Sequence, residues 1–307
     1  MSPLLDLPGA VDGDGVDAGV AWHYGNPVAE QRRLDSGDGW VDLSHRDVVT
    51  MSGPDRLTLL HAMSTQNVER LPAGSWTEGL ILSPHGHVEH HFAGVDDGDR
   101  LTVHTEPDAG VGLVDFLTSM RFMMRVEIAV DAERVVVVGP GDTVTFVTRD
   151  ELAALPERWG PPAGTWAYEA RRIAAGRPRL GLDTDHRTIP NEVGWIGTAV
   201  HMDKGCYRGQ ETVARVHTLG RPPRRLVLLH LDGSAERLPA LGSDLVLDER
   251  VVGRVGSSAR HHELGPIALA LVKRSAPVDA DLVADGVAAA QEMLVDPGVG
   301  LHVRARL

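Results

Sequence analysis

The only cysteine of this 307-residue chain, Cys206, lies in the stretch KGCYRGQE, residues 204–211. Lys204 precedes it by two positions and Arg208 follows it by two. Nearby positive charge favours the thiolate, which is the reactive form of cysteine. Glycines on both sides of the cysteine allow positive φ angles and the close approach of a ligand to the backbone. These residue types predict a reactive thiol on a glycine-hinged loop, tuned or oriented by the two cations.

Lys204 is unusual because the chain has 30 basic residues, and only Lys204 and Lys273 among them are lysines. A lysine is a compact charge whose pKa shifts when the side chain is buried, whereas arginine is a permanently charged fork. This usage favours a role for Lys204 that arginine cannot fill; the alternative is an incidental surface cation. A single cysteine cannot form an internal disulfide, which is typical of a reducing cytoplasm.

Local patterns predict the elements that position this loop. Residues 40–53 alternate as in a strand, and the following residues read as a helix that starts at Pro54. A hairpin is expected around Ser83-Pro84-His85-Gly86, where proline and glycine suit a type I turn. Residues 100–105 then predict another strand.

A helix is expected over 108–123, with strands over 126–130 and 134–139. The helix predicted from Thr165 ends at Gly176, a residue suited to the left-handed conformation after a helix.

From about Arg224 onward, the sequence has a different pattern. Short strands broken by Gly, Asp and Ser indicate a small antiparallel barrel. Pro222 and Pro223 make the preceding segment the expected hinge. We therefore expect an α+β protein with a mobile N-terminus (1–20), a body (21–222) and a C-terminal β-barrel module (223–307).

Composition excludes several classes of protein. The 42% hydrophobic content is enough for a packed core, and no run of about 18 apolar residues predicts a membrane-spanning helix. The acidic, Gly-rich start lacks the features of a signal or transit peptide, so we expect a cytoplasmic protein. The net charge of −13 argues against direct binding to nucleic acid, which requires an excess of Lys and Arg.

The stretch KGCYRGQETVAR resembles the signature of YgfZ-type proteins, a branch of the folate-binding superfamily that includes the glycine-cleavage T-protein, an aminomethyltransferase. The resemblance extends to DLSHRDVVTMSGPDRLTLLHAMSTQNVERLPAG, to RIAAGRPRLGLDTDHRTIPNEVGW and to the β-rich tail. It implies a clover of folate-binding α/β subdomains around a central channel, followed by the barrel. It also implies tetrahydrofolate or a derivative as ligand and no tightly bound metal. The implied role is support of iron–sulfur cluster assembly or repair in client enzymes, including tRNA-modifying ones.

Carried over by position, the signature assigns the chemistry to Cys206 and Lys204. The remaining signature residues shape the loop: Gly205, Tyr207, Arg208, Gly209, Gln210 and Glu211.

Two departures from the aminomethyltransferase pattern concern the folate site. His90 and His91 stand where that pattern has two aspartates, and an imidazole cannot serve as a permanently anionic group there. We therefore predict no glycine-cleavage activity, although residual one-carbon transfer is the alternative function. Ala174 replaces a glutamate that is expected to bind the pterin, which leaves Glu169 and Glu192 as candidate substitutes.

Other candidate folate contacts follow from ligand chemistry. Guanidinium groups pair with carboxylates, and aromatic rings stack on a pterin. The candidates are Arg187, Arg221, Arg224, Arg225, Trp195 and Tyr207.

Three rival interpretations remain open. His85, His87, Glu89 and His91 share one side of the expected strand, so they could bind a metal ion such as Zn²⁺. A cysteine hydrolase would need His201 or His217 beside Cys206. Finally, the protein could act as a folate-responsive scaffold without covalent chemistry.

Overall fold

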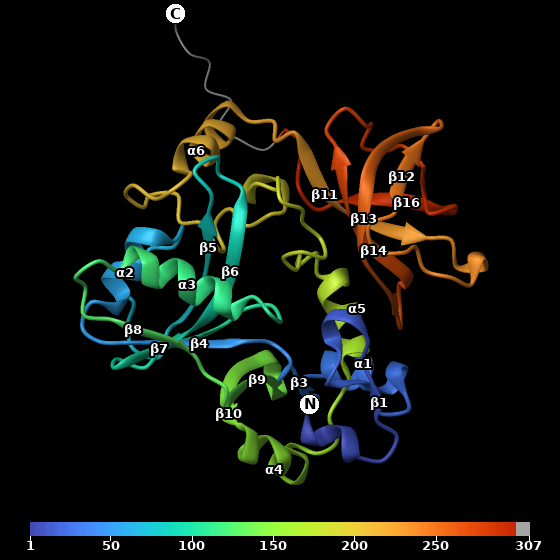
Figure 1. The fold of residues 1–307 in the computed structure, drawn as a ribbon. Coiled ribbons are helices and arrows are strands. Elements are labelled where there is room, and N and C mark those ends of the chain that lie inside the picture. Colours follow the sequence, from blue (N-terminus) through green and yellow to red (C-terminus); the bar gives the residue numbers. More distant parts are fainter. Residues whose placement is uncertain (299–307) are drawn as a thin grey trace, which may run out of the picture. The chain divides into compact units, whose positions relative to one another are not determined.

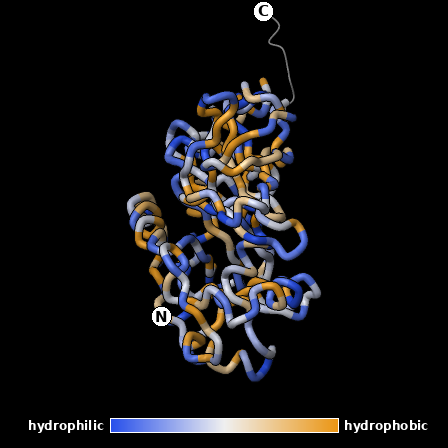
Figure 2. Tube along the Cα trace, turned by 90° about the vertical axis from the view of Figure 1, so that its right-hand side faces the viewer, coloured by the Kyte–Doolittle hydropathy of each residue, from blue (hydrophilic) through white to orange (hydrophobic). Residues whose placement is uncertain are grey.

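The computed structural model describes residues 1–298 and forms two compact units (Figure 1). The first unit comprises residues 1–61, 68–77 and 92–171. The second comprises 62–67, 78–91 and 172–307, of which 299–307 lie outside the described residues. Apolar stretches, orange in Figure 2, occur along both units. Within the described residues, every helix is too short or too polar to span a membrane.

The helices are short and spread along the chain. They are α1 (Pro27–Asp35), α2 (Arg56–Met63), α3 (Gly110–Met120), α4 (Arg149–Trp159), α5 (Thr165–Ala174) and α6 (Gln210–Leu219). Five 3-10 turns accompany them: Pro3–Asp6, Gly15–Asp17, Pro140–Asp142, Pro190–Glu192 and Gly233–Ala235.

The strands form four sheets. The strands before the barrel are β1 (Val11–Asp12), β2 (Ala21–His23), β3 (Val41–Asp42), β4 (Val48–Ser52), β5 (Trp76–Leu82), β6 (Val88–Asp96), β7 (Arg100–His104), β8 (Glu127–Val130), β9 (Arg134–Gly139) and β10 (Thr143–Thr148). They pair as β1-β2, as β10-β9-β3 and as β5-β6-β7-β4-β8. The strand predicted over 40–53 is wrong as a single element, because β3 pairs with β9 whereas β4 pairs with β7 and β8.

The N-terminal segment is packed, in contrast to the mobile tail expected from its composition. Leu4 is buried in a cluster with Trp40 and the apolar face of α4. Ser2 donates a hydrogen bond of 2.5 Å from its hydroxyl to the carboxylate of Asp42. One buried leucine gives no periodic hydrophobic pattern. The sequence therefore did not predict the contacts that hold this segment in place.

The C-terminal strands close into a barrel, which confirms the predicted module. They are β11 (Arg224–Leu231), β12 (Asp244–Leu247), β13 (Arg250–His261), β14 (Gly265–Lys273), β15 (Leu282–Ala284) and β16 (Val287–Met293). Their order is β11-β14-β13-β12-β15-β16, and β11 pairs with both β14 and β16. The interior is filled by small and branched apolar side chains from alternate positions, such as Val227, Leu229 and Leu231 of β11.

A buried polar hub fastens the segment after α5 to the barrel. The carboxylate of Asp183 accepts hydrogen bonds from the Arg172 guanidinium at 2.8 Å and from the Arg179 backbone N–H at 2.9 Å. It also accepts hydrogen bonds from the backbone N–H of Ser257 on β13, at 2.8 Å, and from the Ser257 hydroxyl. A side chain at Gly256 would collide with this carboxylate, since a Cβ there would lie 2.3 Å from Asp183 Oδ1.

Candidate functional site

The signature stretch is a loop over residues 204–209 followed directly by α6. Gln210 and Glu211 therefore lie in the first helical turn rather than in the loop, which differs from the loop expected over the whole stretch. Gln210 still turns back toward the loop, because its side-chain amide donates to the Lys204 carbonyl at 3.4 Å. Cys206 is exposed near the start of this helix.

Lys204 fixes the start of the loop through a contact with Ser64. Its side chain is buried, and its ammonium donates a 2.5 Å hydrogen bond to the carbonyl oxygen of Ser64. Burial lowers the pKa of Lys204 from 10.5 to about 8, because the charged form loses its hydration. Burial thus lowers the pKa of Lys204 in a way that is characteristic of lysine and not of arginine, which stays charged.

Tyr207 packs beside this lysine. The Lys204 Nζ atom lies 5.4 Å from the centroid of the Tyr207 ring, within the range of a cation–π contact. Burial raises the pKa of the Tyr207 phenol to about 12. In this arrangement the tyrosine ring supports the lysine, and the ring is largely covered rather than presented as an open stacking surface.

The two loop glycines have different roles. Gly209 has a φ angle of +78°, and a Cβ at this position would lie 2.5 Å from the carbonyl oxygen of Ser83. Gly205 does not adopt a positive φ angle, and a Cβ there would meet no atom within 4 Å. The hinge predicted at both glycines is therefore required by backbone conformation only at Gly209, while Gly205 leaves open space beside the cysteine.

Arg208 ties the loop to the β5–β6 hairpin. Its guanidinium donates a 2.9 Å hydrogen bond to the Glu89 carboxylate. Both side chains are about one-third exposed, so the ion pair fixes geometry more than it stabilises the fold. The two cations that flank Cys206 thus have partners of their own: Lys204 points to Ser64 and Arg208 to Glu89.

Glu89 also lines a hollow of about 430 Å³ in the second unit, here called the large hollow. Its walls are Val88, Glu89, Leu180, Gly181, Thr184, Asp185, His186 and Arg254. A second hollow of about 150 Å³, the small hollow, adjoins it through Asp185 and Arg254. The small hollow is otherwise lined by Leu182, Asp183, Arg224, Val251, Gly253, Val255, Gly256, Leu271 and Lys273.

Two of the predicted folate contacts pair with each other. Arg224 donates to both oxygens of Glu192 at 2.8 Å and to Asp185 at 2.6 Å. Burial alone would raise the pKa of Asp185, but the hydrogen bonds from Arg224 hold it well below its usual value. Glu192 also accepts from the backbone N–H of Ile189 at 3.1 Å. A ligand would have to compete with these contacts.

The other predicted folate contacts are scattered. Arg225 is buried and donates to the carbonyl oxygens of Lys273 and Ala276, which places it in the barrel wall. Burial lowers the pKa of this guanidinium. Arg187 and Arg221 are exposed, whereas Glu169 lies buried in α5 within the first unit.

The histidines that replace the aspartate pair face different surroundings. His91 Nε2 lies 2.8 Å from Glu78 Oε1, and the His91 ring stacks on Trp195 with centroids 5.2 Å apart. Trp195, which was predicted to stack on a pterin, is buried and stacks on the His91 imidazole in this structure. Burial lowers the pKa of His90, which favours its neutral form.

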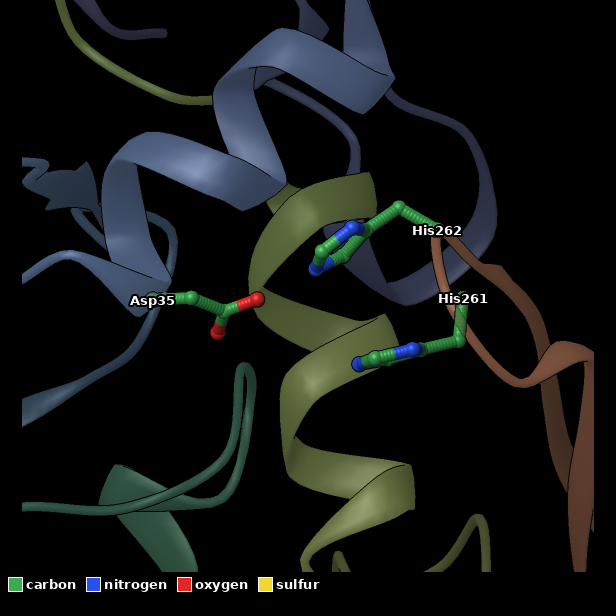
Figure 3. A group of neighbouring side chains, drawn as sticks. All are labelled: Asp35, His261 and His262. Atoms are coloured by element: carbon green, nitrogen blue, oxygen red, sulfur yellow. The ribbon is translucent and has the colours of Figure 1, made fainter.

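The structure does not assemble the predicted metal site. His91 pairs with Glu78 and Glu89 pairs with Arg208, so two of the four expected ligands are engaged by other side chains. In residues 1–298, those four side chains do not converge on a common point. A different pair, His261 and His262 at the end of β13, stacks ring on ring with centroids 4.9 Å apart (Figure 3). The third labelled residue of Figure 3, Asp35, ends α1 and belongs to the other unit.

The hydrolase interpretation also lacks its geometry. Within the described chain, no hydrogen bond joins Cys206 to His201 or His217. His201 instead uses its backbone N–H to bond the Thr65 carbonyl at 3.0 Å, and His217 lies in the last turn of α6. A nucleophilic cysteine needs an imidazole within reach and a third group to orient it.

Sequence reasoning missed two residues of this region. Ser64 supplies the carbonyl that anchors Lys204, across a separation of 140 residues that no local pattern reveals. Arg254 lines both hollows, but in the sequence it is one arginine of an alternating strand. The only available signal was its position between glycines in VVGRVG, a pattern that marks the close approach of another part of the chain: a Cβ on Gly253 would lie 2.4 Å from the Leu271 carbonyl oxygen.

Comparison with known proteins agrees with this architecture. No protein-family model matches the chain. The chain is 24% identical to the aminomethyltransferase of Moorella thermoacetica, over 81% of this chain and 82% of that protein. It is 35% identical to the tRNA-modifying protein YgfZ of Escherichia coli, over 38% of this chain and 34% of that protein. The fold matches the glycine cleavage system aminomethyltransferase T of Bartonella henselae with a TM-score of 0.78 and 16% identity, over 97% of each chain.

A mixed α/β body that carries a closed six-stranded antiparallel barrel is the T-protein fold, and the match to that fold covers 97% of this chain. Its relatives by sequence include both aminomethyltransferases and YgfZ proteins. In sequence the chain is similar to YgfZ proteins over 24% to 38% of its length, and its fold is that of an aminomethyltransferase T-protein.

Proposed function

We propose that this protein is a tetrahydrofolate-binding protein of the cytoplasm that supports iron–sulfur cluster assembly or repair in client enzymes, including tRNA-modifying ones. Cys206 is its reactive group, and Lys204 assists it. The partners are folate and the client proteins, with no direct contact to nucleic acid. The name of its YgfZ relatives, tRNA-modifying protein, supports the link to tRNA modification.

The observation that carries the proposal is the exposed Cys206 on a loop with two fixed ends. Lys204 is anchored to Ser64 and Arg208 to Glu89, while nothing fills the space beside Gly205. The sulfur is therefore accessible to a macromolecule, and the loop presents it in a defined place. A thiolate is a soft ligand of the kind that iron–sulfur clusters bind, so client clusters are suitable substrates.

The residues around the large hollow are chemically suited to a folate. The hollow has the size of a small-molecule site, and Arg254 and His186 in its wall can meet carboxylates. Glu89 links this wall to the cysteine loop through Arg208. When bound, tetrahydrofolate would supply either a one-carbon carrier or a signal of folate status. The protein's own residues would bind its acidic tail and orient the loop.

Aminomethyl transfer is the less favoured function of this site. The carboxylate pair of the aminomethyltransferases is replaced by His90 and His91. His91 is already paired with Glu78 and stacked on Trp195, and burial lowers the pKa of His90. Neither imidazole offers the permanent negative charge that the reaction would require. We expect no glycine-cleavage activity.

Calorimetric titration with tetrahydrofolate, combined with complementation of a strain that lacks its own YgfZ protein, tests the proposal. We expect Cys206→Ser to bind tetrahydrofolate as the wild type does and to fail in restoring the activity of an iron–sulfur client. Full complementation by Cys206→Ser would mean that thiol chemistry is not required, in favour of the scaffold interpretation. A folded wild-type protein that binds no folate would refute the folate assignment.

A further inference from the structure

Arg254 is a cation that forms no ion pair within residues 1–298, although Asp244 is its cross-strand neighbour. It lies on β13, its residue is exposed, and it forms part of the wall of both hollows. Among residues 1–298, no hydrogen bond or ion pair engages its guanidinium. Its Nη2 atom lies 3.1 Å from the position that a Cβ on Gly242 would take, so the side chain rests over a residue without bulk.

The carboxylates in the same walls have other partners. Asp183 accepts hydrogen bonds from Arg172 at 2.8 Å and from backbone N–H groups. Asp185 is bonded by Arg224 at 2.6 Å, and Glu89 by Arg208 at 2.9 Å. The carboxylates in these walls are thus each matched by a different arginine, and Asp244, the cross-strand neighbour of Arg254, forms no ion pair with it among residues 1–298.

The other cations of the small hollow are less available than Arg254. Arg224 binds Asp185 and Glu192, and Lys273 donates its ammonium to the Val251 carbonyl at 2.8 Å. A carbonyl is a neutral acceptor, so this contact gives Lys273 no counter-charge at the hollow. The hollows therefore offer one unengaged guanidinium and, next to it, a second positive charge.

We propose that Arg254 is the anion-binding residue of both hollows and that it holds carboxylates of the glutamate tail of a bound folate. The inference rests on the proposed folate function and adds a specificity to it. A guanidinium pairs with carboxylates through two parallel N–H···O bonds. The small hollow, at about 150 Å³, is too small for a pterin but admits a carboxylate-bearing chain beside Lys273. The site therefore prefers folates with more than one glutamate.

Isothermal titration with tetrahydrofolate monoglutamate and triglutamate tests this specificity. We expect the wild-type protein to bind the triglutamate more tightly, and Arg254→Gln to lose about tenfold or more in affinity for it. The loss for the monoglutamate should be smaller. Arg250→Gln is the matched control, because it removes the same charge from an exposed position of the same strand outside both hollows.

Arg254→Lys provides a second measurement that does not depend on the loss of charge. It keeps the cation and removes the bidentate fork, so we expect an affinity between those of wild type and Arg254→Gln. Equal affinities of wild type and Arg254→Gln for the triglutamate would overturn the inference and leave the folate function intact. Equal losses in Arg254→Gln and Arg250→Gln would also overturn it, since bulk charge would then explain the effect. No binding by the wild type would overturn both proposals.

Discussion

Gly209 and Gly86 pack backbone against backbone. A Cβ on Gly209 would lie 2.8 Å from the Gly86 Cα, and a Cβ on Gly86 would lie 3.1 Å from the Gly209 carbonyl oxygen. Both residues have positive φ angles, of +78° and +81°. The turn between β5 and β6 thereby packs directly against the start of α6. Three residues after its first residue, the helix presents Val213 to the interior. The contact fixes where the cysteine loop ends.

Gly209→Ala should destabilise the protein, because the new Cβ meets backbone atoms on one side and the φ angle is unfavourable for alanine. The expected cost is about 1–3 kcal/mol in the free energy of unfolding. Gly205→Ala, near the other end of the loop, should change it by less than about 0.5 kcal/mol, since its Cβ enters open space. Urea denaturation followed by circular dichroism compares the two, and equal midpoints would contradict this account.

Lys204 should titrate with a pKa of about 8, because burial disfavours its charged form. The chain contains only two lysines, so protein labelled at the lysine ε-carbons gives two side-chain NMR signals, one of them from Lys273. A Lys204→Met variant assigns the signals by loss of one. A Lys204 signal that titrates near the ordinary value of 10.5 would show that the ammonium is hydrated.

The same shift predicts a pH dependence of stability. Below pH 8, Lys204 is protonated in both folded and unfolded states, and the cost of burying its charge is fully present. Between about 8 and 10.5 the unfolded chain retains a proton that the folded protein has released, so this residue's contribution becomes more favourable as pH rises. The unfolding free energy of wild type minus that of Lys204→Met should therefore increase across this range in urea titrations. A difference that stays constant with pH would rule the linkage out.

Cys206 should react in the native protein. Its exposure predicts that a thiol reagent such as 5,5′-dithiobis-(2-nitrobenzoate) labels one sulfur per chain at a rate within about tenfold of that in denaturant. The single cysteine makes the stoichiometry unambiguous, and Cys206→Ser supplies the blank. Labelling that requires denaturant would show a covered sulfur and would remove the basis for client contact.

Asp183→Ala should destabilise the second unit by about 3–5 kcal/mol, because it leaves the buried Arg172 guanidinium without its counter-charge. It also removes the acceptor for the Ser257 backbone N–H of β13. Asp279→Ala is the control, since Asp279 is an exposed residue of the same unit. Thermal unfolding measures both. Similar midpoints for the two variants would mean that the hub contributes little.

The sequence predicted those parts of the fold that depend on local patterns. The barrel could be predicted because its short strands are separated by typical turn residues. The helix end near Gly176 could be predicted because glycine favours the left-handed conformation, and its φ angle is +66°. The turn before β6 closes with the expected hydrogen bond from the Gly86 N–H to the Ser83 carbonyl at 2.9 Å.

Other parts could not be predicted, because distant segments decide them. Residues 40–53 read as one strand, but the partners of β3 and β4 belong to different sheets. Cys206 is predicted as the reactive residue from its neighbours in the chain alone, whereas the groups that hold its loop are Ser64 and Glu89, which are remote in sequence. Likewise, nothing local distinguishes Arg254 from Arg225, although one faces two hollows and the other is enclosed by barrel carbonyls.

The pairing of β11 with β16 has a consequence for biosynthesis. These strands are the first and the last of the barrel in chain order, and Val227 pairs with Met293. As the polypeptide leaves the ribosome, β11 therefore keeps an unpaired edge until some sixty further residues have appeared, a span that follows from the register itself. An open apolar edge of that kind invites pairing with other nascent chains. Slowed translation within the barrel should accordingly promote aggregation.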